Sequence, residues 1–188
     1  MPHFLTDAEH RTLRAVMDRL IPGDEWGPGA GGAGAADYVD LLLGAFSFDP
    51  PRIWAGGPFS GRHGGGPGFD RWLELGPTEE LAWRIRIEGS QGRPERSFNG
   101  PVTGWQERYR SVLATVGDDL ADLPPDRQSD RIAGLDEPDR TLLYTHACEA
   151  HYGDPTYGGN RDGAAWQAIG FDGDVLPRGW TDAEVSGP

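Results

Sequence analysis

The spacing of large apolar residues between positions 102 and 120 constrains the fold of this chain more than any other feature. These residues recur every three or four positions, which is the period of an α-helix with one buried face. The set consists of Val102, Trp105, Tyr109, Val112, Leu113, Val116 and Leu120. The segment therefore predicts a long amphipathic helix, whose stability depends on other elements packing against it.

Two other segments contain residues that are typical of a helix start. Thr6 and Glu9 match the capping box, in which each side chain accepts a hydrogen bond from the other residue's backbone N–H. The helix that follows should end at Pro22, and its apolar face comprises Leu13, Val16, Met17, Leu20 and Ile21. Asp136 is expected to cap a second helix over about 138–152, with its inward face formed by Leu142, Leu143 and Ala147.

Four weaker patterns complete the helical prediction. A helix is expected over 36–46, with a buried set of Tyr38, Leu41, Leu42, Ala45 and Phe46. Another begins at Pro77, and its continuation fits either a helix or a strand. A short helix is expected over 124–133. Asp162 is predicted to cap a last short helix that carries Trp166 and Ile169 and ends at Gly170.

Glycine and proline limit how much regular structure can surround these helices. The chain of 188 residues contains 29 Gly and 16 Pro, and 37% of it is hydrophobic, so much of it must be loop. We expect a flexible glycine loop at 27–36 and long loops at 50–69 and 88–101. The predicted fold is mainly α: a single irregular domain over 1–188, with about six to seven helices, long Gly/Pro-rich loops and a C-terminal tail at 175–188.

The loop at 50–69 holds more large apolar side chains than a linker normally does. Trp54, Phe59 and Phe69 all lie within it. A loop of this length inside a compact domain is usually functional or disordered. We therefore expect these three side chains to contact a partner protein.

The charge of the chain excludes several kinds of partner. The net charge is −13, and all 17 basic residues are arginine, a bias that a GC-rich genome explains. Residues 52–110 contain 7 acidic residues and 9 arginines, whereas residues 111–188 contain 15 and 5. Such a field repels nucleic acids and anionic membrane surfaces. No apolar stretch approaches the length of a membrane span, and the single Cys148 excludes an intramolecular disulfide.

The residues that could carry chemistry do not form a recognised catalytic pattern. No glycine-rich run has the residues of a nucleotide-binding motif, and no serine lies in a nucleophile elbow. His146 and Glu149 share a helix face at i, i+3, and His151 follows, which suits metal ligands. However, a second helix with a matching pair is absent from the sequence. An independent metalloprotein or enzyme that uses His146, Glu149 and His151 is kept as the alternative function.

The segment 157–163, YGGNRDG, is the most unusual local feature of the chain. It can be explained as a tight structural turn in which two glycines adopt positive φ and two Asx residues bond nearby backbone. The residues of this turn are Gly158, Gly159, Asn160, Asp162 and Trp166. Arginine with aromatic neighbours is also typical of the centre of a protein interface. We expect Trp166 to lie in the core, and Tyr157 and Arg161 to face outward and bind a partner.

Three stretches of the sequence are similar to a known family. The start FLTDAEHRTLRAVMDRLIPGDE, the later GAADYVDLLL and above all DPTYGGNRDGAAWQAIGFDG resemble the gluconate 2-dehydrogenase subunit 3 family. The resemblance covers the first forty-odd residues and about 140–174. It implies a small, non-catalytic subunit, so that no catalytic, cofactor-binding or metal-binding residue is expected in this chain itself.

The resemblance also implies partners and a location. The large partner would be an FAD-binding subunit of the glucose-methanol-choline oxidoreductase family that oxidises a sugar, glycoside, sugar acid or related alcohol. A multihaem cytochrome c subunit completes some such complexes. Small subunits of the family often carry a twin-arginine signal, which is not found at the start of this sequence. We therefore expect a cytoplasmic location, with co-export by the partner, or a transient role as an export chaperone, as the alternatives.

Overall fold

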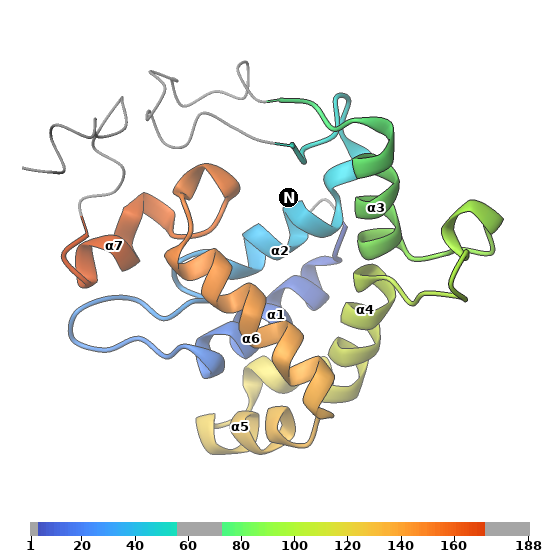
Figure 1. Cartoon of the computed structure of the whole chain (residues 1–188). Helices are drawn as coiled ribbons and strands as arrows, with labels where there is room; N and C mark the ends of the chain where they lie inside the picture. The colour runs from blue at the N-terminus through green and yellow to red at the C-terminus, as the bar shows by residue number, and fades with distance from the viewer. Residues whose placement is uncertain (1–3, 56–72, 172–188) are drawn as a thin grey trace, which may run out of the picture.

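The computed structural model describes residues 4–55 and 73–171 (Figure 1). Within these residues it contains seven α-helices and several short 3-10 turns, which confirms the prediction of a mainly α fold. The α-helices are α1 (Asp7–Leu20), α2 (Ala35–Leu43), α3 (Pro77–Glu88), α4 (Trp105–Val116), α5 (Pro125–Ala133), α6 (Glu137–Tyr152) and α7 (Ala164–Ala168). The 3-10 turns are Ala45–Ser47, Pro94–Arg96, Leu120–Asp122, Pro155–Tyr157 and Arg161–Gly163.

The helices with clear start signals form as predicted. The capping box at α1 is present, because Glu9 N donates to Thr6 Oγ1 (3.2 Å) and Thr6 N donates to Glu9 Oε2 (2.8 Å). Asp136 caps α6 by accepting a hydrogen bond from Asp139 N at 2.9 Å. In both helices a side chain satisfies backbone donors that have no partner within the helix, so local sequence alone fixes where the helix begins.

The long amphipathic segment forms a shorter helix than expected. The helix α4 spans Trp105–Val116 and is bounded by Gly104 and by Gly117, whose φ is +87°. Val102 lies before the helix and is exposed, while Leu120 is buried in the following 3-10 turn. The apolar spacing in the sequence therefore extends beyond both ends of α4. The helix itself is shorter, because glycine at each end changes the direction of the chain.

The alternating apolar residues after Pro77 belong to a helix, so the strand interpretation of this segment is wrong. The helix α3 has Pro77 at its first turn, and Glu79 Oε2 accepts from Gly76 N at 2.8 Å. Arg84 Nε donates to Glu80 Oε1 (2.7 Å), one turn earlier. These favourable starts and i, i+4 ion pairs outweigh the apparent strand alternation.

The buried face of α2 differs from the predicted one. Val39, Asp40 and Leu43 are buried, whereas Tyr38, Leu41 and Leu42 are only partly covered. Asp40 lies inside because its Oδ1 accepts hydrogen bonds from Phe4 N (2.9 Å) and Leu5 N (2.7 Å). A buried carboxylate that satisfies backbone N–H groups is stable, and this contact rotates the helix away from the face that hydrophobicity predicts.

The glycine segment before α2 is packed against α1, which corrects the expectation of a flexible loop at 27–36. Ala30 and Ala33 are buried, and Ala30 N donates to Ile21 O at 2.9 Å. A Cβ atom at Gly31 would lie 2.2 Å from Arg14 O. Glycine is therefore required here because the backbone approaches the helix closely.

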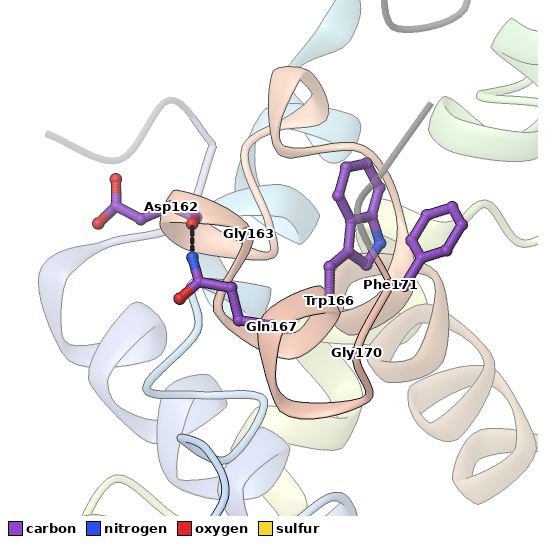
Figure 2. A pocket seen from close by; sticks show the side chains of 6 residues that line it. All are labelled: Asp162, Gly163, Trp166, Gln167, Gly170 and Phe171. Carbon is purple, nitrogen blue, oxygen red and sulfur yellow. Dashed lines mark hydrogen bonds between the residues drawn. The ribbon is translucent and has the colours of Figure 1, made fainter. Parts of the chain in front are cut away.

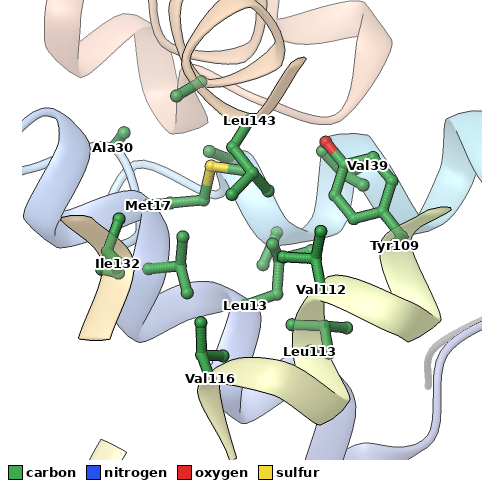
Figure 3. Close-up of a cluster of buried hydrophobic side chains, with 14 of the residues drawn as sticks. Leu13, Met17, Ala30, Val39, Tyr109, Val112, Leu113, Val116, Ile132 and Leu143 are labelled. Atoms are coloured by element: carbon green, nitrogen blue, oxygen red, sulfur yellow. The ribbon is translucent and has the colours of Figure 1, made fainter. Parts of the chain in front are cut away.

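The main core lies where α1, α2, α4, α5 and α6 meet. Figure 3 shows its side chains, among which Met17, Tyr109 and Leu143 come from three different helices. In Figure 1, α6 crosses α1 and α2, with α3 and α4 to one side and α7 to the other. A smaller cluster of Ala45, Ile53 and Ile87 lies beside the main core, with Trp83 and Trp105 packed against it. None of the helices in the described part of the chain has the length and apolar composition to cross a membrane.

Candidate functional site

The polar turn after α6 is held in place by close backbone packing. Gly158 has a φ of +97°, as the predicted turn requires. Gly159 is different, because it is not among the glycines with positive φ in the described residues. A Cβ atom at Gly159 would lie 2.2 Å from Ala150 O on α6. The second glycine is therefore needed for close approach to α6 and not for a left-handed conformation.

Asn160 is the residue that fastens this turn to the helices on either side. Its side chain is completely buried. Nδ2 donates to Gly153 O at the end of α6 (3.0 Å), and Oδ1 accepts from Ala165 N in α7 (2.9 Å). Its φ of +42° is one that asparagine tolerates better than most residues. Asn160 thus connects two helices through both ends of one amide group.

Asp162 does not cap α7, which corrects the prediction. The residue before α7 is Gly163, which makes no side-chain cap hydrogen bond. Asp162 is exposed with a φ of +58°, and it is its backbone O that accepts a bond from Gln167 Nε2 at 2.8 Å (Figure 2). Asn160 bonds Ala165 N instead, because the chain reverses between the two Asx residues and turns the Asp162 side chain away.

Arg161 joins the turn to α2. Its backbone N donates to Ala33 O (2.8 Å), and its Nη2 donates to Asp37 Oδ2 (2.5 Å). Asp37 Oδ1 also lies 2.9 Å from His10 Nε2 on α1. The side chain of Arg161 is 57% exposed and that of Asp37 39% exposed, so the pair lies at the surface. Arg161 therefore faces solvent, but it already has one carboxylate partner within the chain.

Tyr157 and Trp166 lie in partly covered positions on either side of this turn. Tyr157 is 38% exposed, and burial, with Asp154 nearby, raises the pKa of its phenol. Trp166 is only partly buried, so the prediction that it lies in the core is wrong. Its Nε1 donates to Tyr152 O (2.8 Å), and Phe171 packs edge-on against its ring at 5.2 Å (Figure 2). An indole whose N–H bonds backbone at the surface positions α7 without entering the core.

The structure describes only one of the three residues of the 50–69 loop that are predicted to contact a partner. Trp54 is described and partly buried, next to the buried Ile53. Phe59 and Phe69 lie outside the described residues. The contact of all three with a partner therefore stays a prediction.

A second candidate region is a groove between α2, α3, α4 and α6, with a cavity volume of about 370 Å3. Its aromatic walls are Trp83 from α3 and Trp105 from α4, whose ring centroids lie 6.2 Å apart. Arg86 and Arg108 also line the groove. The signal for it in the sequence is the spacing of Trp83 and Arg86, which share one face only if the segment forms a helix.

His146 lies at the base of this groove and is held there by two aromatic residues. Its Nδ1 is 2.8 Å from the Tyr109 hydroxyl, and the Trp105 ring packs edge-on at 4.7 Å. Burial, and to a smaller degree the charge of Arg108, lowers the pKa of His146 to about 4. Arg108 itself is paired with Asp139 Oδ1, at 3.0 Å from its Nε. His146 is therefore neutral near pH 7 and forms part of the core.

The residues of the metal-site alternative, His146, Glu149 and His151, each make separate contacts. Glu149 is exposed and accepts a hydrogen bond from the Tyr38 hydroxyl at 3.0 Å, and burial raises the pKa of that phenol. His151 is buried, with its ring against Tyr152, and its Nδ1 has no hydrogen-bond partner among the described residues. Residues 146 and 151 are separated by more than a third of a helical turn around the axis. Within 4–55 and 73–171, no three His, Cys, Asp or Glu side chains are placed to hold a metal ion.

Comparisons with known proteins identify the family of this chain. No curated protein and no solved structure shows significant similarity to it. One family profile, described as gluconate 2-dehydrogenase subunit 3, matches residues 7–173. This match includes the seven α-helices of the described residues, the polar turn and the groove. The chain therefore belongs to the gluconate 2-dehydrogenase subunit 3 family.

Proposed function

We propose that this chain is the small, non-catalytic subunit of an oxidoreductase complex, in which it binds and stabilises an FAD-dependent large subunit of the glucose-methanol-choline family. The observation that carries the proposal is the family match over residues 7–173, since the family is named for a subunit of a dehydrogenase. The substrate class of the complex is a sugar, glycoside, sugar acid or related alcohol. FAD belongs to the large subunit, and a cytochrome c subunit is a further proposed partner.

The surface of the chain supports a role in binding another protein. Large apolar side chains are exposed in several places, including Trp26 (74%), Phe98 (94%) and Ile169 (61%). The buried His146 contacts the core residue Tyr109, and Glu149 accepts a hydrogen bond from Tyr38. Side chains that contact the core or one another stabilise the fold. The exposed apolar side chains remain available for binding another protein.

The proposal is tested by comparing three samples in a dye-linked assay of sugar oxidation. These are the large flavoprotein subunit alone, this chain alone, and the two expressed together. We expect no turnover from this chain alone, and a longer half-life of activity for the flavoprotein when the chain is present. Robust turnover by this chain alone would overturn the non-catalytic assignment.

A permanent subunit must also be distinguished from a transient chaperone. The two differ in whether the chain stays bound after the flavoprotein has taken up FAD. Size-exclusion chromatography of the mature complex separates them. We expect this chain in the fraction that contains FAD, whereas a chaperone would elute without it.

A further inference from the structure

We propose that the groove between α2, α3, α4 and α6 is a docking surface, and that its occupant is an apolar segment of the flavoprotein subunit that carries a carboxylate and pairs it with Arg86. This inference rests on the proposed function, because it names the surface by which the subunit binds its partner. The lining of this groove includes Trp83, Arg86, Trp105, Thr145, His146 and Glu149.

Arg86 is the residue that identifies the chemistry of the occupant. Its guanidinium carbon lies 4.8 Å from the centroid of the Trp83 ring and 5.6 Å from that of Trp105. It is exposed, and among residues 4–55 and 73–171 no carboxylate forms an ion pair with it. Two indole rings thus fix the position of a charge that has no counterion within the described part of the chain.

The neighbouring arginine of the groove, Arg108, already has a carboxylate partner. Arg108 Nε donates to Asp139 Oδ1 at 3.0 Å, so its charge is already balanced. Among the described residues, Glu149 is the one carboxylate that lines the groove, and it accepts a hydrogen bond from Tyr38. Arg86 is therefore the groove arginine to which an incoming carboxylate can bind without displacing an existing ion pair.

The adjoining surface of α6 has the composition of an interface. Between Thr141 and Tyr152, its exposed residues are two threonines, two tyrosines and Glu149. Tyr144 and Tyr152 are 53% and 47% exposed. Interface centres are enriched in tyrosine and depleted of acidic residues, and this stretch contrasts with a chain whose net charge is −13.

Net charge favours a different protein over a second copy of this chain as the occupant of the groove. Two copies with a net charge of −13 each repel one another at low ionic strength. Arg86 would have to find its carboxylate within that repulsive pair. A flavoprotein segment can instead present an apolar side chain to Trp83 and Trp105 and a carboxylate to Arg86. Because the rings already restrict Arg86, it loses little conformational freedom when it binds.

The test measures the affinity of chain variants for the flavoprotein subunit. Arg86→Glu reverses the charge in the groove, and Arg127→Glu makes the same change at an exposed position of α5. We expect Arg86→Glu to weaken binding by about tenfold or more, as loss of an interface hot spot does, and Arg127→Glu to weaken it by less than about threefold. Equal effects of the two variants would overturn the docking surface.

Two further variants keep the test decisive if Arg86→Glu does not fold. Arg86→Gln removes the charge with little change in shape and should weaken binding less than Arg86→Glu. Thr145→Arg places a large side chain at an exposed position of the groove wall and should block docking. Wild-type affinity in both variants would overturn the proposal.

The remaining outcomes separate this inference from the proposed function. If wild-type chain fails to bind the flavoprotein, the proposed function fails and the docking surface fails with it. If wild-type chain binds and the groove variants bind equally well, only the docking surface is wrong. If the chain is a dimer that Arg86→Glu dissociates, the occupant is a second copy and the assignment to the flavoprotein is overturned.

Discussion

The hydroxyl oxygen of Tyr109 and Nδ1 of His146 lie 2.8 Å apart where α4 meets α6. The two rings are parallel within 1°, and both side chains are buried. This contact gives each polar group a partner inside the core, where an unpaired one would be destabilising. It also explains why a histidine that resembles a metal ligand in the sequence is a packed core residue in the structure.

The buried His146 predicts a specific dependence of stability on pH. Its pKa is lowered from 6.5 to about 4, so between these values the unfolded chain binds a proton that the folded chain does not. The contribution of neutral His146 to the free energy of unfolding is therefore fully present above about pH 6.5. It decreases as the pH falls and is lost once the pH has passed through about 4. The total loss from this group is on the order of 3 kcal/mol.

Urea unfolding of wild type and His146→Gln at a series of pH values measures this effect. The difference in free energy of unfolding between the two proteins should shrink as the pH falls from about 6.5 to about 4. A difference that stays constant over this range would show that His146 is not buried in its neutral form.

Close packing of the polar turn predicts that two glycines respond differently to alanine. Gly159→Ala would place Cβ 2.2 Å from Ala150 O, a backbone atom that cannot move without distorting α6. We expect a loss of about 2 to 3 kcal/mol in the free energy of unfolding. Gly170→Ala is the control, because its φ is +69° but no atom of the described residues lies within 4 Å of an added Cβ. It should cost about 1 kcal/mol, and equal costs in a urea titration would refute the close approach.

The two Asx residues of the turn are expected to differ in the same measurement. Asn160→Ala removes the hydrogen bonds to Gly153 O and Ala165 N, and it leaves the buried Ala165 N–H without its side-chain acceptor. We expect a loss of about 2 to 3 kcal/mol. Asp162→Ala removes an exposed carboxylate at a φ of +58° and should cost only about 1 kcal/mol, from the left-handed backbone. A larger loss at Asp162 than at Asn160 would indicate that Asp162 caps α7.

The variant Arg161→Ala distinguishes the contribution of Arg161 to folding stability from its contribution to binding the flavoprotein. The ion pair with Asp37 is more than one-third exposed on both sides, so its loss should cost at most about 1 kcal/mol of stability. We nevertheless expect weaker binding to the flavoprotein, since a guanidinium has five N–H donors and can bond a second acceptor. Arg127→Ala serves as the control. If Arg161→Ala abolished turnover in a complex that still forms with bound FAD, the turn would reach the active site.

The sequence predicted the parts of the fold that depend on neighbouring residues. Capping at Thr6 and Asp136 fixed α1 and α6, because these hydrogen bonds form within a single turn. The buried face of α2 was missed because Asp40 bonds Phe4 and Leu5, which are 36 and 35 positions away. Hydrophobic periodicity contains no information about a carboxylate that is buried by tertiary contacts.

Prediction of the candidate sites from the sequence is limited in the same way, by contacts between residues that are distant in the chain. Asn160 and Asp162 are equally good caps by residue type, and only the position of Gly153 and Ala165 in space decides between them. The groove was not predicted because Trp83 and Trp105 belong to different helices and meet only after folding. The family could nevertheless be identified from the polar turn, since that motif is contiguous in the sequence.

Co-purification tests the central claim, that this chain is a lasting subunit of a flavoprotein complex, most directly. The chain is tagged, expressed together with the large subunit of the glucose-methanol-choline family, and passed over a size-exclusion column while protein and flavin absorbance are recorded. We predict one peak that contains both chains in a fixed ratio together with FAD. Elution of the tagged chain alone, apart from all flavin absorbance and with the flavoprotein equally stable without it, would contradict the account.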